Sequence, residues 1–144
     1  MVVICSKPFT EIGYDEYFNK YPFPLSDFQK YSIHATVNGH HSLITAHTGS
    51  GKSLPAEFAI EHCVAKGKRV IYTSPIKALS NQKYYDFRTK YPDITFGLMT
   101  GDIKMNPDAD VLIMTTEILM NYLFTYKEEE DEQGIHFQMD IKKE

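Results

Sequence analysis

Short apolar runs alternate with longer amphipathic segments along the chain, and polar or glycine-containing breaks separate them. Apolar runs of about 4–8 residues are typical of buried strands, whereas longer segments with helical periodicity predict helices. The runs that predict strands are 42–46, 69–74, 94–100 and 110–115. The segments that predict helices are 27–38, 52–65, 76–90 and 117–124. Strands that alternate with helices indicate a parallel sheet with helices on both faces, so we predict an α/β fold.

Residues that favour helix ends support these boundaries. Ser26 precedes the first long helix and is a typical N-cap, and Gly39 follows that helix. Gly67 would end the second long helix. Pro55 falls in the first turn of that helix, where its missing N–H costs little. The turn chemistry therefore agrees with the hydrophobic pattern.

Composition fits one globular domain, because the chain has 144 residues of which 42% are hydrophobic. We expect an irregular arm at 1–24, the folded domain at 25–126 and an acidic, polar, mobile tail at 127–144. The apolar runs are too short to cross a bilayer and the N-terminus has no secretory pattern, so we expect a soluble, intracellular protein. Cys5 and Cys63 lie far apart, which favours two reduced thiols over a disulfide or a zinc site.

The stretch AHTGSGKS, residues 46–53, carries the clearest chemistry. It fits the phosphate-loop pattern GxxxxGK[ST] except that Ala46 replaces the first glycine, and it lies between a predicted strand and a predicted helix. Backbone N–H groups of such a loop point at phosphate oxygens at the positive end of the helix dipole. Lys52 would reach the β- and γ-phosphates, and the Ser53 hydroxyl would bind Mg²⁺. A glycine-rich turn without a ligand is the alternative. The residues predicted to hold the nucleotide here are Thr48, Gly49, Ser50, Gly51, Lys52 and Ser53.

Other candidate residues lie upstream and downstream of this loop. Phe23 precedes Gln29 by six residues and offers an aromatic face beside an amide, a pair suited to stacking on adenine and reading its edge. Polar stretches also follow three predicted strands, namely SPIKALSNQ (74–82), TGD (100–102) and TTEIL (115–119). Because the formal net charge is -4, bulk positive charge does not attract nucleic acid, but hydroxyls and amides at one sheet edge suit a single-stranded sugar-phosphate backbone.

The ordered set of YPFPLSDFQ, AHTGSGKS, PIKALSNQK, TGD and TTEIL resembles the first RecA-like domain of superfamily-two RNA helicases. It is most similar to the DExH-box group of superkiller-type, exosome-associated helicases, over roughly residues 21–125. The resemblance implies an ATP-dependent RNA helicase with a RecA-like P-loop NTPase fold, with ATP and Mg²⁺ as cofactors and RNA as partner. It implies catalytic roles for Lys52 and Ser53 and adenine contacts by Phe23 and Gln29. The residues that it places along the RNA path are Pro75, Lys77, Thr100, Gly101, Asp102, Thr115 and Thr116.

The sequence departs from this group in one large respect. An Asp–Glu pair after an apolar strand should follow, to hold Mg²⁺ and polarise the attacking water, and we expect no such strand before Glu144. The run EEEDE at 128–132 follows no buried strand, and Asp140 lies in a polar setting. A second RecA-like domain is also missing. We therefore interpret the chain as an incomplete first domain, truncated before the DExH motif, which would hydrolyse ATP negligibly by itself.

Three hypotheses follow. In the first, the chain is the ATP- and RNA-binding segment of a helicase and works with the remainder of the motor. In the second, it is a naturally short nucleotide- or RNA-binding remnant without catalysis. A phosphate-loop kinase or transport ATPase is disfavoured, because the sequence has no lid-like arginine cluster and no LSGGQ-type signature.

Two further features have competing interpretations. Tyr84, Tyr85 and Phe87 share a predicted helix with Lys83 and Arg88, a mixture that can stack bases, but packing of this helix on the sheet is the favoured interpretation. His47 lies inside the glycine loop, where we expect a positional role rather than a catalytic one.

Overall fold

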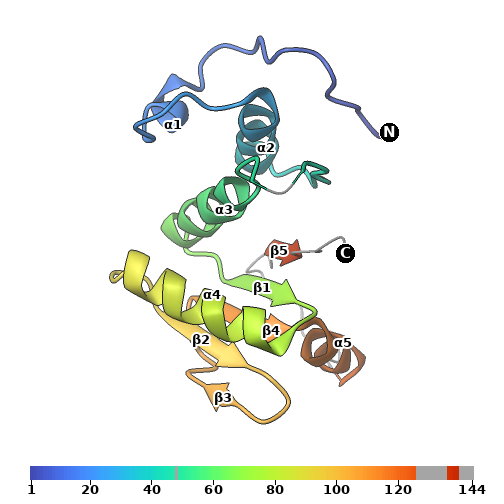
Figure 1. Ribbon diagram of the computed structural model, residues 1–144, viewed down its shortest axis with the longest axis vertical. Helices are drawn as coiled ribbons and strands as arrows, with labels where there is room; N and C mark the ends of the chain where they lie inside the picture. The colour runs from blue at the N-terminus through green and yellow to red at the C-terminus, as the bar shows by residue number, and fades with distance from the viewer. Residues whose placement is uncertain (48, 126–135, 140–144) are drawn as a thin grey trace. The chain divides into compact units, whose positions relative to one another are not determined.

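The computed structural model describes residues 1–47, 49–125 and 136–139. Contacts divide the chain into two compact units, Met1–His62 and Cys63–Glu144. Figure 1 shows the helices of the first unit in blue and green and the strands of the second unit in colours from yellow-green to red.

The first unit is helical. It contains the short helix α1 (Asp15–Phe18), helix α2 (Asp27–Val37) and most of helix α3 (Ser53–Ala65). The predicted helix ends are confirmed, since Ser26 is the N-cap of α2 and Gly39 and Gly67 follow α2 and α3 with positive φ. Apolar side chains of α2 and α3 form the core of this unit, with aromatic residues of the arm packed around it. The buried members are Ile33, Leu54 and Phe58.

The arm before α2 is fixed to that helix through Phe9. The Phe9 ring makes edge-on contacts with the rings of Tyr31 and His34 on α2, with centroids 5.1 and 5.8 Å apart. The Phe9 backbone N–H also donates to Asp27 Oδ1 at 3.1 Å. Since Asp27 is the first residue of α2, the arm is attached at the beginning of the helix as well as along its side.

The second unit is built on a five-stranded sheet in the order β3-β2-β4-β1-β5. Its strands are β1 (Val70–Ser74), β2 (Phe96–Met99), β3 (Lys104–Met105), β4 (Val111–Thr115) and β5 (His136–Met139). Only the β2–β3 pair is antiparallel, whereas β1 pairs in parallel with β4 and β5, and β4 pairs in parallel with β2. The predicted parallel sheet is therefore confirmed for the segments that became β1, β2 and β4.

Helices cover both faces of this sheet, as predicted. On one face, Phe87 of α4 (Lys77–Lys90) packs against Tyr72 and Phe96, with ring centroids 5.5 and 6.1 Å apart. On the other face, Leu119 of α5 (Thr116–Thr125) joins a cluster with Leu112 and Met114 of β4. Alternate residues of a strand point to opposite faces, so the continuously buried β4 supplies side chains to both layers.

One expectation about strands is wrong, and one strand was not expected. Residues 42–46 form no strand, and Leu43 is 88% exposed. A strand needs a partner for its backbone groups, and a short apolar run does not by itself supply one. Residues 136–139 form β5, a strand that the hydrophobic pattern did not indicate; its sequence HFQM is not an apolar run followed by an Asp–Glu pair. β5 lies at the end of the sheet and pairs with β1 through backbone hydrogen bonds. Such pairing does not require a long apolar run in the sequence.

The acidic run at 128–132 and Asp140 lie outside the described residues. Within the described ranges, no helix has the length and apolar character needed to span a membrane. In the same part of the chain, no group of three or more His, Cys, Asp or Glu side chains is arranged to hold a metal ion.

Candidate functional site

The glycine loop adopts a tight, left-handed course before α3. Gly49 and Gly51 have φ of 83° and 86°, values that other residues rarely adopt. The Ser50 backbone N–H and hydroxyl both donate to the His47 carbonyl, at 3.2 and 2.6 Å. His47 thus contributes its carbonyl to the shape of the loop. Thr48 lies outside the described residues.

Donor groups collect where this loop enters α3. The backbone N–H groups of Gly51, Lys52 and Ser53 have no acceptor among the residues that the structure describes. The side chains of Lys52 and Ser53 are both exposed. The first N–H groups of a helix carry partial positive charge, so the loop combines free amides, an ammonium and a hydroxyl at one position. This donor set fits a polyphosphate and its associated Mg²⁺.

Gln29 connects α2 to the glycine loop. Its side chain is buried, with 6% exposed. Nε2 donates to the Gly51 carbonyl at 3.1 Å, while Oε1 accepts from the Ser26 backbone N–H at 3.0 Å. The second contact is half of a capping box, which the spacing of Ser26 and Gln29 would have predicted from sequence. The contact with Gly51 joins residues 22 positions apart, and no local signal predicts it.

Phe23, the other predicted adenine contact, is about half exposed. Its ring centroid lies 5.9 Å from that of Tyr21. The aromatic face remains available for stacking because Phe23 is outside the buried core of its unit.

The second unit brings the other predicted residues to one edge of its sheet. Pro75 and Lys77 follow β1, Thr100 to Asp102 follow β2, and Thr115 ends β4 beside Thr116. In the sheet register Ser74 is paired with Thr115, and Met99 with Met114. The three strands therefore end within one residue of one another, and the residues that follow them share the carboxyl edge of the sheet, where ligands of α/β proteins commonly bind.

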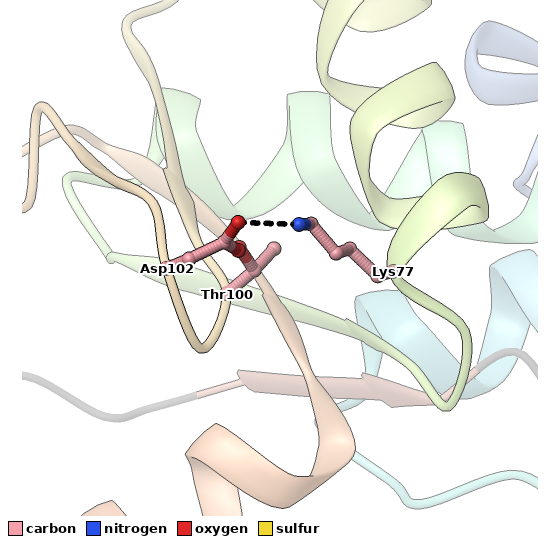
Figure 2. A network of polar contacts seen from close by, with 3 residues as sticks. All are labelled: Lys77, Thr100 and Asp102. Carbon is pink, nitrogen blue, oxygen red and sulfur yellow. Dashed lines mark hydrogen bonds and ion pairs between the residues drawn. The ribbon is translucent and has the colours of Figure 1, made fainter.

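A polar network connects two of these segments (Figure 2). Lys77 Nζ lies 2.6 Å from Asp102 Oδ2, and the Thr100 hydroxyl donates to Asp102 Oδ1 at 3.1 Å. Hydrogen bonds from Lys77 and then Thr100 lower the pKa of the Asp102 carboxyl below its ordinary value. The Thr100 N–H donates to the Ile103 carbonyl at 2.9 Å, which closes the turn that carries Asp102.

Two buried polar atoms lie in these motifs, one on Thr116, which was predicted to line the RNA path, and one on Asn81, which the sequence analysis missed. The Thr116 hydroxyl oxygen and the Asn81 amide oxygen are buried and have no hydrogen-bond partner among the described residues. Asn81 belongs to the SPIKALSNQ stretch but was not selected there. The sequence pattern could not single out Asn81, because burial of one amide oxygen depends on tertiary packing.

The favoured interpretation of the aromatic helix is confirmed. Tyr84 and Phe87 of α4 are buried, with 6% and 3% exposed. Arg88 extends over the Tyr84 ring, with its guanidinium carbon 5.9 Å from the centroid. Tyr85 alone of the three aromatic residues is exposed. Packing on the sheet therefore uses most of this aromatic surface.

Comparison with known proteins gives the same assignment as the motifs. The sequence profile described as DEAD/DEAH box helicase matches residues 26–139, most of the chain. The chain belongs to the DEAD/DEAH box helicase family. This match covers the glycine loop, Gln29 and the polar sheet edge, and it confirms the family predicted from the five motifs.

Several curated relatives are close in sequence. The chain is 48% identical over 126 residues to "mRNA transport homolog 4" of Caenorhabditis elegans, a match that covers 83% of this chain and 12% of that protein. It is 48% identical to "Antiviral helicase SKI2" of Saccharomyces cerevisiae, covering 72% of the chain and 8% of the relative. It is 49% identical to human "Exosome RNA helicase MTR4", covering 73% and 10%. The chain thus spans about a tenth of the length of these relatives.

Proposed function

We propose that this chain is the ATP- and RNA-binding segment of an ATP-dependent RNA helicase that unwinds duplex RNA in its full-length form. The observation that carries the proposal is the set of donors at Gly51, Lys52 and Ser53 without an acceptor among the described residues, in a loop that two left-handed glycines shape before α3. Relatives named as RNA helicases, at 48–50% identity, support the same activity class.

In this proposal the loop residues 48–53 hold the phosphates of ATP. Lys52 would neutralise the β- and γ-phosphates through its exposed ammonium, and the exposed Ser53 hydroxyl would be the protein ligand for Mg²⁺. The ion, when bound, would offset negative charge that develops on the transferred phosphoryl group. The free amides of Gly51 to Ser53 would bind phosphate oxygens from the start of α3.

The adenine would be held by Phe23 and Gln29. Phe23 offers an exposed ring for stacking. A carboxamide can donate two hydrogen bonds and accept two, and Gln29 uses one donor for Gly51 and one acceptor for Ser26. The remaining donor and acceptor of Gln29 suit the amino group and ring nitrogen of an adenine edge.

RNA would run along the carboxyl edge of the sheet in the second unit. Hydroxyls of Thr115 and Thr116 would bind sugar and phosphate oxygens, and Lys77 would be the cation of this set. The Thr100 hydroxyl, which donates to Asp102, would accept from a ribose hydroxyl. Such contacts recognise the backbone rather than the bases, which suits a motor that acts on many sequences. The full set of proposed RNA contacts is Pro75, Lys77, Thr100, Gly101, Asp102, Thr115 and Thr116.

Unwinding would require a second motor domain that closes on this one when ATP binds. That domain, within the remainder of the helicase, is the proposed partner of this segment. The attacking water would be polarised by a carboxylate, and the described residues offer none at the glycine loop within the first unit. We therefore expect this chain alone to bind ATP and to hydrolyse it negligibly.

The decisive experiment is titration of the chain with a fluorescent ATP analogue in the presence of Mg²⁺. Lys52→Ala should weaken binding at least tenfold, because loss of a charge-assisted contact costs about 1.5–3 kcal/mol. Lys66→Ala, which removes another exposed lysine, is the matched control and should leave affinity within twofold. Equal affinities of the Lys52 and Lys66 variants would refute the proposed phosphate site. RNA-stimulated hydrolysis by this chain that Lys52→Ala abolishes would refute the expected lack of turnover.

A further inference from the structure

The ion pair between Lys77 and Asp102 joins two segments that are not neighbours in the sheet. Lys77 follows β1 and Asp102 follows β2, whereas β4 lies between these two strands. The pair therefore links the segments that flank the carboxyl end of β4, where Thr115 and Thr116 lie. Figure 2 shows the Lys77 side chain extending from the start of α4 toward the loop that carries Asp102.

The exposure of this pair argues against a structural purpose. The Lys77 side chain is 49% exposed and that of Asp102 is 67% exposed, so water screens their attraction. Ion pairs of this kind contribute little to stability. The arrangement of the carboxylate is nevertheless fixed, because the buried Thr100 donates to its other oxygen. Asp102 is thus held in position to meet Lys77, although the contact stabilises the fold little.

The charges of the proposed RNA path make this contact consequential. Lys77 is the one cation among the seven proposed RNA contacts, and Asp102 is the one anion. An ion pair at 2.6 Å cancels most of the field that Lys77 would otherwise present to a phosphate. In the absence of RNA the edge is close to neutral, on a chain whose formal net charge is -4.

We propose that Lys77, Thr100 and Asp102 form a charge gate, in which Asp102 occupies the Lys77 ammonium until a phosphate of single-stranded RNA displaces it. The inference rests on the proposed RNA path and reverses the role of one of its residues, because Asp102 competes with RNA rather than binding it. After displacement, Asp102 keeps the Thr100 hydroxyl as its partner. Because RNA must compete with Asp102 for Lys77, its affinity is lower than the hydrogen-bond donors of the sheet edge would give without Asp102. Bound RNA is therefore released faster.

The test is a fluorescence-anisotropy titration of labelled single-stranded RNA of about 10 nucleotides, which fits the site size of such grooves. Asp102→Asn keeps the shape of the side chain and an oxygen that accepts from Thr100, but removes the charge. A unit charge about 5 Å from a phosphate in water changes affinity about fourfold. We expect Asp102→Asn to bind RNA about fourfold more tightly at low salt, with a smaller gain at high salt.

Asp86→Asn is the matched control. Asp86 is exposed on the same helix, nine residues beyond Lys77, which is about 14 Å along the helix axis. It changes the net charge equally but lies beyond the Debye length of about 10 Å at 0.1 M ionic strength, so at that ionic strength affinity should change less than twofold. In a Lys77→Met background no ammonium is left for Asp102 to release. There, Asp102→Asn should raise the logarithm of the RNA affinity by at most half as much as it does in the wild-type background.

The outcomes separate this inference from the proposed function. Tighter RNA binding by Asp102→Asn than by Asp86→Asn, dependent on Lys77, supports the charge gate. Weaker binding by Asp102→Asn would show that Asp102 positions Lys77 for RNA, and equal changes in both variants would show that the pair is inert. Either result overturns the gate while RNA binding stands. Absence of RNA binding in the wild type and in Asp102→Asn would overturn both the gate and the RNA path.

Discussion

Replacement of Gly51 by alanine tests the link between α2 and the glycine loop. Two effects act together at this position. The φ of 86° places a non-glycine residue in the left-handed region, and a Cβ built on Gly51 would lie 2.5 Å from Gln29 Nε2. The Gln29 side chain can move aside, but then its hydrogen bond to the Gly51 carbonyl is lost and a buried amide remains without that acceptor.

The magnitudes of these effects can be separated by a second glycine. The φ of Gly49 is 83°, and nothing lies within 4 Å of a Cβ built there. Gly49→Ala should therefore show the backbone cost alone, about 1–2 kcal/mol, reduced by about 0.4–1 kcal/mol because alanine restricts the unfolded chain. The net destabilisation is about 1 kcal/mol. Gly51→Ala adds the loss of the Gln29 contact, about 1–3 kcal/mol, for a total of about 2–4 kcal/mol.

Urea unfolding followed by circular dichroism measures both free energies of unfolding. In a Gln29→Ala background no amide is left to displace, so Gly51→Ala should cost only about 1 kcal/mol there, the same as Gly49→Ala. The reasoning is refuted if the two glycine variants lose equal stability in the wild-type background. It is also refuted if the extra cost of Gly51→Ala persists without Gln29.

Two other predictions concern the second unit. The pKa of Asp102 is lowered in the folded state, so its contribution to stability is present above the ordinary aspartate pKa of 3.8 and is lost as pH falls below that value through the folded pKa. Carbon-13 NMR of its carboxyl should show a midpoint below 3.8 that rises in Lys77→Met, and a midpoint at or above 3.8 in the wild type would contradict the network. Gly97→Ala should destabilise the sheet by about 3 kcal/mol, because the added Cβ meets backbone carbonyl oxygens of Met105 and Asn106 that cannot rotate away. Gly101→Ala, whose Cβ meets nothing within 4 Å, should change the urea midpoint little, and similar midpoints for both variants would contradict the packing argument.

Local signals were sufficient for much of the fold. Helix α2 follows from its cap at Ser26 and its terminating Gly39, and β4 follows from an apolar run that is buried throughout. Segment 42–46 carries the same kind of apolar signal, yet it forms no strand because strand formation depends on partners elsewhere in the chain. Strand β5 is the converse case, since pairing with β1 outweighs a weak local pattern.

The candidate site was predicted as residue types rather than as contacts. A glycine-rich loop with Lys52 and Ser53 is recognisable because its chemistry needs those residues at fixed spacing. The contact between Gln29 and Gly51 and that between Lys77 and Asp102 join distant positions, so they follow from tertiary structure alone. Adenine binding by Gln29 and an RNA contact by Asp102 stay predictions. The structure shows which protein groups these side chains contact, namely Ser26 and Gly51 for Gln29 and Lys77 and Thr100 for Asp102.

The two hydrogen bonds of Gln29 restrict which residues position 29 can accept. Glutamate could accept from the Ser26 N–H but could not donate to the Gly51 carbonyl, and it would bury a negative charge. Asparagine has both groups but is one methylene shorter, so it cannot reach both partners from the same backbone position. Lys30, the next residue, is only partly buried, and its position does not require a side chain that both donates and accepts a hydrogen bond. In a deep mutational scan, position 29 should therefore be among the least tolerant of α2, with its neighbour far more permissive.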